Sequence, residues 1–256
     1  MIFRQMKLAQ LVPSSMTYGC LLQACVKNND IQTALEVFNT MKADRVQMNT
    51  VIYTTMIKAY QKSYQLEKAL EIYETMLKEM KTNPNSAPNI VTFNSLLDCC
   101  VRCFDVAQAT QIFHQMLDPT APASCRPDLI TYSIMIKGYC KDKNIEQAFV
   151  TLQLMEKTGI KADFALYKSL MIGCCKNNQM EMALKVYENM RLLGIKPTDV
   201  YRLEKKGGPK RHGKHSVSFE FEKSLEEQKS DDDYLHDFHR ICNLYRGPRP
   251  RPGFLF

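Results

Sequence analysis

Five stretches of this chain repeat one pattern, and that repetition constrains the fold more than any other feature. Each stretch contains an aromatic residue, then an alanine, then a methionine at similar distances. Successive copies of all three markers are separated by the same intervals of 35, 40, 39 and 35 residues. A period in this range predicts a solenoid of stacked supersecondary units. The markers are Tyr18, Tyr53, Phe93, Tyr132 and Tyr167; Ala34, Ala69, Ala109, Ala148 and Ala183; and Met41, Met76, Met116, Met155 and Met190.

One unit, residues 129–163, shows that the pattern predicts two helices. Apolar residues recur at helical spacing over 132–139 and again over 145–155. Each helix would be about 12–14 residues long and marginal alone in water, so it needs neighbours to bury its apolar face. Ala148 would mark the close approach of the two helices. We therefore expect an all-α fold, a right-handed superhelical α-solenoid of helix-turn-helix repeats with a concave groove lined by the first helices.

The breaks between helices carry residues suited to turns and caps. In the same unit Asn144 suits a tight turn, Gly159 a left-handed helix end, and Asp163 the N-cap of the next helix. Two units are longer than the others, with extra residues after Met76 and after Met116. Both insertions contain prolines and fall between repeats, where the stack can absorb them.

These markers divide the chain into repeats and two remaining segments. Phe3 and Met6 lie 35 residues before Phe38 and Met41, so the chain opens within the second half of another repeat. We therefore expect a piece of a longer protein. The divisions are 1–14 for the partial repeat, 15–49, 50–89, 90–128, 129–163 and 164–198 for the five complete repeats, and 199–256 for an irregular tail with a helix near 234–244.

Composition narrows the class of protein. The net charge of +7 is compatible with a polyanionic partner without demanding one. No apolar run reaches the roughly 18–20 residues that a membrane span requires, so we expect no membrane association. Several of the ten cysteines recur at equivalent repeat positions, which is typical of small buried packing residues and not of a disulfide framework. Cys100 and Cys103 form a C-x-x-C, but no second pair stands at zinc-finger spacing.

The units resemble pentatricopeptide repeats. First helices read VTFNSLLDCCVR at 91–102 and ITYSIMIKGYCK at 130–141, and second helices read ALEVFNTMK at 34–42 and ALKVYENMR at 183–191. Repeats close with GIKAD at 159–163 and GIKPT at 194–198. The related tetratricopeptide repeat opens on a tryptophan motif, and this chain has no tryptophan. The resemblance covers about residues 1–198.

This resemblance implies sequence-specific binding of single-stranded RNA, one base per repeat, with two side chains reading each base. In the family, the residue after the opening aromatic and the last residue of the repeat read the base, and the residue two before the aromatic packs against it. The implied reader pairs are Gly19 with Asn49, Thr54 with Asn89, Asn94 with Asp128, Ser133 with Asp163, and Lys168 with Thr198; the implied base-packing residues are Met16, Val51, Val91, Ile130 and Ala165.

Hydrogen-bond chemistry assigns three of the bases. The carboxylates of Asp128 and Asp163 only accept, which favours the ring N–H of uracil or guanine, whereas the amide of Asn89 can donate to adenine or cytosine. A small hydroxyl at the first reader leaves room for a purine, and the larger Asn94 favours a pyrimidine. With the strand orientation that the resemblance implies, the expected target is 5′-N-A-U-G-N-3′. The two flanking bases stay open because the first and fifth pairs depart from readable combinations.

An alternative interpretation needs no RNA. Asn89, Asp128 and Asp163 all stand where a helix N-cap is expected, so a structural role alone would explain their residue types. However, all five repeats combine a closing reader position with a base-packing position, and this repeated combination favours recognition of RNA.

The tail after Thr198 lacks the repeat pattern. A basic cluster there could contact phosphates or be a solvated loop. His236, His239 and Cys242 are three apart, but a fourth metal ligand is not evident, so we expect no metal and no cofactor. The tail lacks the H-x-E and P-C-x-x-C signatures of a deaminase, and Asp231–Asp233 is a contiguous run, so we expect no enzyme. The cluster comprises Lys205, Lys206, Lys210, Arg211 and Lys214.

The sequence thus predicts an RNA-binding protein that acts in organellar RNA processing, stability or translation, in mitochondria or alternatively in plastids. Other RNA-processing or ribosomal proteins are candidate partners. Two rival functions remain open. One is a protein-binding scaffold of the same fold, such as a ribosomal component. The other is an RNA-processing enzyme with an unrecognised domain in residues 199–256.

Overall fold

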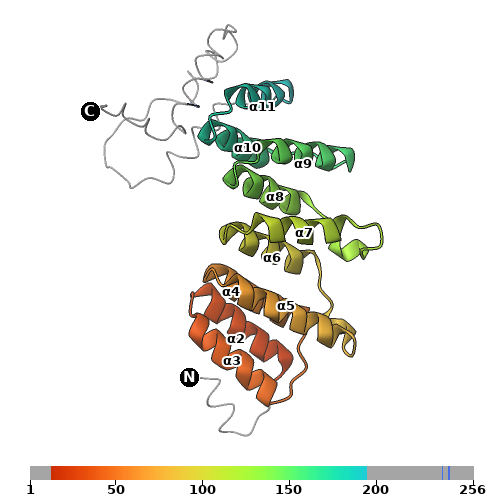
Figure 1. Cartoon of the computed structure of the whole chain (residues 1–256). Coiled ribbons are helices and arrows are strands. Elements are labelled where there is room, and N and C mark those ends of the chain that lie inside the picture. The colour runs from red at the N-terminus through yellow and green to blue at the C-terminus, as the bar shows by residue number, and fades with distance from the viewer. Residues whose placement is uncertain (1–12, 195–237, 239–241, 243–256) are drawn as a thin grey trace, which may run out of the picture. The chain divides into compact units, whose positions relative to one another are not determined.

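The structure, a computed structural model, describes residues 13–194 together with Phe238 and Cys242. Within these residues it contains ten α-helices and two short 3-10 helices and no strand, which confirms the predicted all-α class (Figure 1). The helices are α2 (Ser15–Lys27), α3 (Ile31–Ala43), α4 (Thr50–Lys62), α5 (Leu66–Met80), η1 (Pro84–Ser86), α6 (Ile90–Arg102), α7 (Val106–Leu117), η2 (Ala123–Cys125), α8 (Leu129–Lys141), α9 (Ile145–Lys157), α10 (Phe164–Lys176) and α11 (Met180–Leu192).

The helices alternate between the first and second positions of the predicted repeats. The chain forms two compact units, one ending at Gly138 and one beginning at Tyr139, so that α8 contributes to both. In the first unit α2 packs on α3, α4 on α5 and α6 on α7, and in the second unit α10 packs on α11. Helical hairpins of this kind are the repeating element of an α-solenoid, as the sequence predicted.

Within the first unit the stacking is carried mainly by the first helices. Helix α4 packs against both α2 and α6, whereas the second helices α3, α5 and α7 contact one another less. The row of first helices is therefore the closely packed side of this stack. That the first helices line a concave groove, and that the whole chain forms a right-handed superhelix, stay predictions.

The repeated markers form the core. The five marker alanines are fully buried, the five methionines are at most 1 % exposed, and the five opening aromatics are also buried. The hydroxyl of Tyr18 donates to Asp44, and that of Tyr53 donates to Glu79, so two of these rings are also tied to the end of their own second helix. Burial and the neighbouring carboxylate raise the pKa of Tyr18. The periodicity of the sequence is thus the periodicity of the core.

The turn between α8 and α9 uses two residues in different roles. Asn144 has φ −92° and caps α9 by accepting a hydrogen bond from Gln147 N, whereas the left-handed residue of that turn is Lys143, with φ +63°. Asn144 thus ends the turn as the N-cap of α9, a role in which negative φ lets its side chain reach the start of the helix. Gly159 is left-handed at φ +80°, as predicted. The left-handed hairpin residues are Asn29, Tyr64, Phe104, Lys143 and Asn178.

Both insertions lie between repeats, as expected. The first one partly lengthens α5 to Met80 and then forms η1, whose buried Ser86 donates to Asn83 O at 2.7 Å. The second follows α7 and forms η2, where Cys125 is buried. Each insertion adds a short ordered segment beside the stack without interrupting a helix.

The buried cysteines are packing residues. Burial raises the pKa of the Cys100, Cys140 and Cys174 thiols to about 12, so these thiols stay neutral at physiological pH. Cys103 of the C-x-x-C is the C-cap of α6. Across residues 13–194, with Phe238 and Cys242, the structure brings together no set of three metal-ligating side chains. The same part of the chain holds no helix with the length and hydropathy of a membrane span.

Candidate nucleic-acid interface

The predicted base-packing residues lie in solvent. Each stands in the first turn of a first helix, where Met16 is 78 %, Ile130 59 %, Val51 50 % and Val91 45 % exposed, and Ala165 is exposed as well. Single exposed apolar residues are common on protein surfaces. Here, however, an exposed apolar residue recurs at one position of five successive repeats. Their recurrence provides one flat apolar contact per repeat, of the kind that a base face can cover.

The predicted closing readers are helix N-caps. The side-chain oxygen of Asn49 accepts from Ile52 N at 3.1 Å, that of Asn89 from Val91 N and Thr92 N at 3.1 Å each, and that of Asp163 from Leu166 N at 2.8 Å. The capping role that the alternative interpretation predicted is therefore present. Each cap uses only the Oδ1 atom. Within the described residues the second polar atom of these three side chains makes no hydrogen bond.

The third repeat brings its two predicted readers into contact. Asn94 lies on α6 and Asp128 precedes α8, 34 residues later, yet Asn94 Nδ2 donates to Asp128 Oδ1 at 3.2 Å. The buried Thr131 hydroxyl lies 2.7 Å from Asn94 Oδ1 and 2.9 Å from Asp128 Oδ1, and Thr131 N donates to Asp128 at 2.8 Å. This network orients both half-buried side chains. Asp128 Oδ2 makes no hydrogen bond within the described residues.

The remaining predicted readers differ in accessibility. Thr54 is only 6 % exposed, and its hydroxyl lies 2.8 Å from that of the buried Thr92, so a base reaches it only if Thr92 releases it. Gly19 is buried against Ile52 of the next first helix. Ser133 and Lys168 are half-buried on α8 and α10. Thr198 lies outside the described residues, so the fifth pair stays a prediction.

A set of cations was missed by the sequence reasoning. Every first helix ends on a Lys or Arg in its last turn, and these residues repeat at the marker intervals of 35, 40, 39 and 35. Each cation follows the base-packing residue of its helix by 11 residues, or three helical turns, so both lie on one face. These cations could have been found in the sequence from the same periodicity that revealed the markers. The cations are Lys27, Lys62, Arg102, Lys141 and Lys176.

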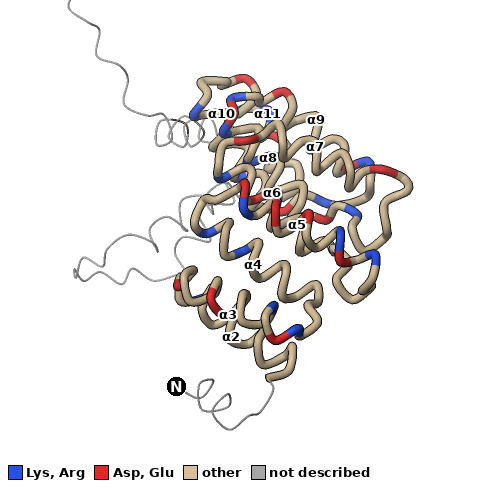
Figure 2. The backbone as a smooth tube through the Cα atoms, turned by 60° about the horizontal axis from the view of Figure 1, so that its bottom comes forward, with Lys and Arg blue, Asp and Glu red and all other residues tan. Residues whose placement is uncertain are grey.

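These cations also have a local structural role. A positive charge in the last turn of a helix is stabilised by the helix dipole. The Lys62 ammonium donates to Val26 O of α2 at 2.6 Å, and Arg102 pairs with Asp98 at 2.6 Å. Figure 2 shows Lys and Arg spread over successive helices, interspersed with Asp and Glu. The charge is therefore distributed along the repeats, as an elongated polyanion would require.

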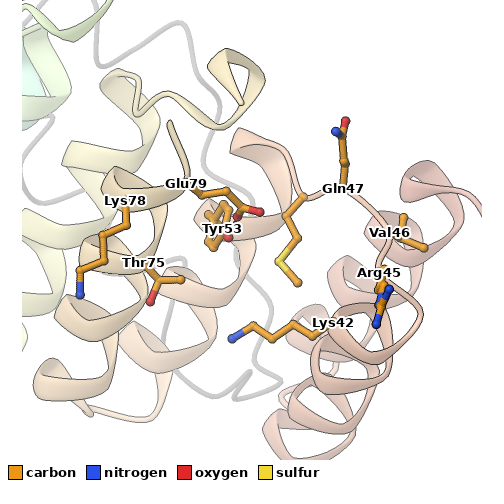
Figure 3. Close-up of a pocket in the computed structure, with 9 residues that line it drawn as sticks. Lys42, Arg45, Val46, Gln47, Tyr53, Thr75, Lys78 and Glu79 are labelled. Carbon is orange, nitrogen blue, oxygen red and sulfur yellow. Dashed lines mark hydrogen bonds between the residues drawn. The ribbon is translucent and has the colours of Figure 1, made fainter. Parts of the chain in front are cut away.

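The pocket in Figure 3 belongs to the repeat junction, not to this interface. It has a volume of about 490 Å³ and is lined by the end of α3, the following loop and α5, with Glu79 beside Tyr53. A second pocket, of about 450 Å³, has Tyr167 and Glu156 in its wall and lies at a later junction. Tyr53 and Tyr167 are equivalent opening aromatics. The two pockets therefore reflect repeat geometry, and they share no recognition residues that would make one a dedicated site.

Several predicted tail residues cannot be placed in this interface. The basic cluster Lys205, Lys206, Lys210, Arg211 and Lys214 lies outside the described residues, as do His236 and His239. Cys242, the third member of the weighed His-Cys set, is buried and its Sγ lies 3.1 Å from Cys175 Sγ.

Fold and site together define a class, an α-solenoid of helical hairpins. Each first helix of the described repeats has an exposed apolar residue in its first turn and a cation in its last turn. A family model described as the pentacotripeptide-repeat region of PRORP matches residues 4–193. The chain therefore belongs to the pentatricopeptide repeat family. Two Arabidopsis thaliana relatives are the pentatricopeptide repeat-containing proteins At5g10690, 34 % identical over 68 residues, and At5g18475, 31 % identical over 72 residues. These alignments cover 27 % and 28 % of this chain and only 11 % and 14 % of the relatives.

Solved structures show the same fold. The pentatricopeptide repeat protein PPR10, known from maize, in complex with an 18-nt psaJ RNA element, superposes with a TM-score of 0.63 at 26 % identity, covering 75 % of this chain and 27 % of PPR10. The PPR domain of Arabidopsis thaliana protein-only RNase P 1, in complex with tRNA, has a TM-score of 0.55 at 18 % identity and covers 80 % of this chain and 93 % of that domain. The chain thus spans about a quarter of PPR10.

Proposed function

We propose that this chain binds single-stranded RNA through its row of first helices, with one base per repeat. RNA binding by pentatricopeptide repeats is supported by the RNA-bound relatives. The observation that carries the base-by-base arrangement is the contact between Asn94 and Asp128, two residues 34 positions apart within one repeat that the fold joins beside an exposed apolar residue. A base that lies against Val91 would meet both polar side chains at its edge.

The proposed chemistry is recognition and not catalysis. Bases stack on the exposed residues of the first turns, the paired polar groups read their edges, and the last-turn cations neutralise phosphates. Stacking contributes roughly 1–3 kcal/mol per base, and ordering the strand offsets much of it. Five repeats therefore bind weakly, and the chain spans only part of its relatives' length. The target remains 5′-N-A-U-G-N-3′.

The biological setting is the organelle. A third Arabidopsis thaliana relative, 28 % identical over 80 residues, is named as mitochondrial. On this basis we propose a mitochondrial protein, with the plastid as the alternative, that covers an RNA segment or positions other RNA-processing or ribosomal proteins on it. A scaffold that binds only protein would show no saturable RNA binding.

Selection from a random RNA pool tests the assignment. Replacing Asn94 with Thr should change the preferred base at one position from uracil to guanine and leave the other positions unchanged, because the shorter side chain makes room for a purine while Asp128 still accepts from a ring N–H. Asn39→Thr, an exposed change on the second helix α3, is the matched control and should leave the selected motif intact. An unchanged motif in Asn94→Thr would contradict the reader assignment.

A further inference from the structure

A pair of aromatic rings recurs at the repeat junctions. At the first three junctions the residue four after the marker alanine is aromatic and packs against the opening aromatic of the next first helix, whereas at the fourth junction that residue is Leu152. Phe38 meets Tyr53 at 6.3 Å between ring centroids, Tyr73 meets Phe93 at 5.8 Å and Phe113 meets Tyr132 at 5.6 Å, with interplanar angles of 66–82°. These edge-on pairs orient each hairpin relative to the one that follows it.

The last hairpin also has an aromatic residue at this position, but residues 199–256 do not continue the repeat pattern. Tyr187 stands four residues after Ala183, so its ring is at the position that packs against the opening aromatic of a following first helix. Its partner is Phe238, at 5.4 Å and 60°. Phe238 comes 51 residues later in the chain, is in helical conformation and is 3 % exposed. The tail thus supplies the ring that the repeat pattern omits.

A second contact identifies the same place independently. The residue eight after the opening aromatic of a first helix touches the following first helix: Gln61 donates to Asp98, Val101 lies against Gly138, and Cys140 lies against Gly173. On α10 the equivalent residue is Cys175, and its Sγ lies 3.1 Å from Cys242 Sγ. Cys242 is fully buried, is in helical conformation and stands four residues after Phe238 in the sequence.

We infer that Phe238 and Cys242 take the places that residues of a sixth first helix would have and cap the end of the repeat stack. Both of their contacts reproduce a repeat-to-repeat contact, one with the second helix and one with the first helix of the last hairpin. A solenoid end otherwise leaves apolar surface in water, which is why terminal repeats of such proteins are capped. The end of the repeat stack is therefore covered by Phe238 and Cys242 from the tail of the same chain. This inference is independent of RNA binding.

Thiol labelling of the intact chain tests the placement directly. Iodoacetamide should modify the exposed Cys20 rapidly and Cys242 about 100-fold more slowly or less, because Cys242 reacts only when the cap opens. Cys20 serves as the reference in the same molecule, and mass spectrometry of the peptides reads both rates. Equal rates for Cys242 and Cys20 would overturn the inference.

A substitution then tests the energetic role of the cap. Phe238→Ala should speed labelling of both Cys175 and Cys242 and increase hydrogen exchange in α10 and α11 by about 100-fold, because removing a buried ring favours opening of the cap. Exchange in α2–α5 should not change. Leu192→Ala, a truncation at an 82 % exposed residue of α11, is the matched control and should alter neither readout. If Phe238→Ala leaves both readouts as in the parent chain, the tail is not a cap.

Discussion

At the scale of single residues, the closing residue of a repeat has an observed capping role and a proposed reading role. Asn49, Asn89 and Asp163 each cap a first helix through one side-chain oxygen, while the second polar atom makes no hydrogen bond within the described residues. The rival interpretations of the sequence, cap or reader, are thus compatible. The residue types at these closing positions could be predicted from helix capping alone. The approach of Asn94 to Asp128 depends on stacking between repeats, so it could only be inferred from the family resemblance.

Changing Asp128 to Asn separates the two roles. Asn and Asp are similarly effective N-caps, so the free energy of unfolding should change by less than about 0.5 kcal/mol. The amide can donate where the carboxylate only accepts, so the preferred base at this position should change from uracil to cytosine. Urea denaturation and RNA selection measure the two effects. Asp105→Asn, which changes the N-cap of the second helix α7, is the control and should not alter the motif.

At the scale of helices, the spacing between first helices is set by small residues. A Cβ added at Gly173 would lie 2.4 Å from Cys140 Sγ and 2.6 Å from its Cβ, closer than atoms can pack. The period, the hairpins and the buried markers were all predictable from the sequence, because they follow from apolar spacing. The close approach at Gly173 was not, because glycine in a helix carries no sign of what lies opposite.

Two glycine substitutions should therefore have opposite effects. Gly173→Ala should lower the free energy of unfolding by about 1–2 kcal/mol, because steric overlap outweighs the helix propensity that alanine adds. Gly19→Ala should raise it by about 0.5–1 kcal/mol, because the new Cβ would meet only Ile52 Cδ1 at an ordinary 3.4 Å. Both glycines are interior to first helices, so each is the control for the other. Equal effects in urea denaturation would contradict the packing argument.

At the scale of the whole molecule, the last-turn cations predict how binding depends on salt. If all five contact phosphates, the logarithm of the binding constant should fall with the logarithm of salt concentration with a slope of about −3.5. Lys27→Gln should make that slope shallower by about 0.7 and weaken binding to every sequence alike. Lys27 is exposed at the end of α2.

The matched control for this prediction is Lys68→Gln. Lys68 is exposed on the second helix α5, away from the row of first helices. Its substitution removes the same charge as Lys27→Gln. Titrations at several salt concentrations should give the parent slope for this variant. A slope that changes equally in Lys27→Gln and Lys68→Gln would mean that net charge, and not the row of first-helix cations, determines binding.

The N-capping residues at repeat ends have an evolutionary consequence. Few side chains can hold a helix start, yet among them Asn and Asp offer opposite hydrogen-bonding character to a bound nucleotide. Exchange between these two residues needs one nucleotide change in a codon and leaves the fold intact. A lineage of such proteins can therefore drift from one transcript to another in single steps, without first losing and then regaining a stable array.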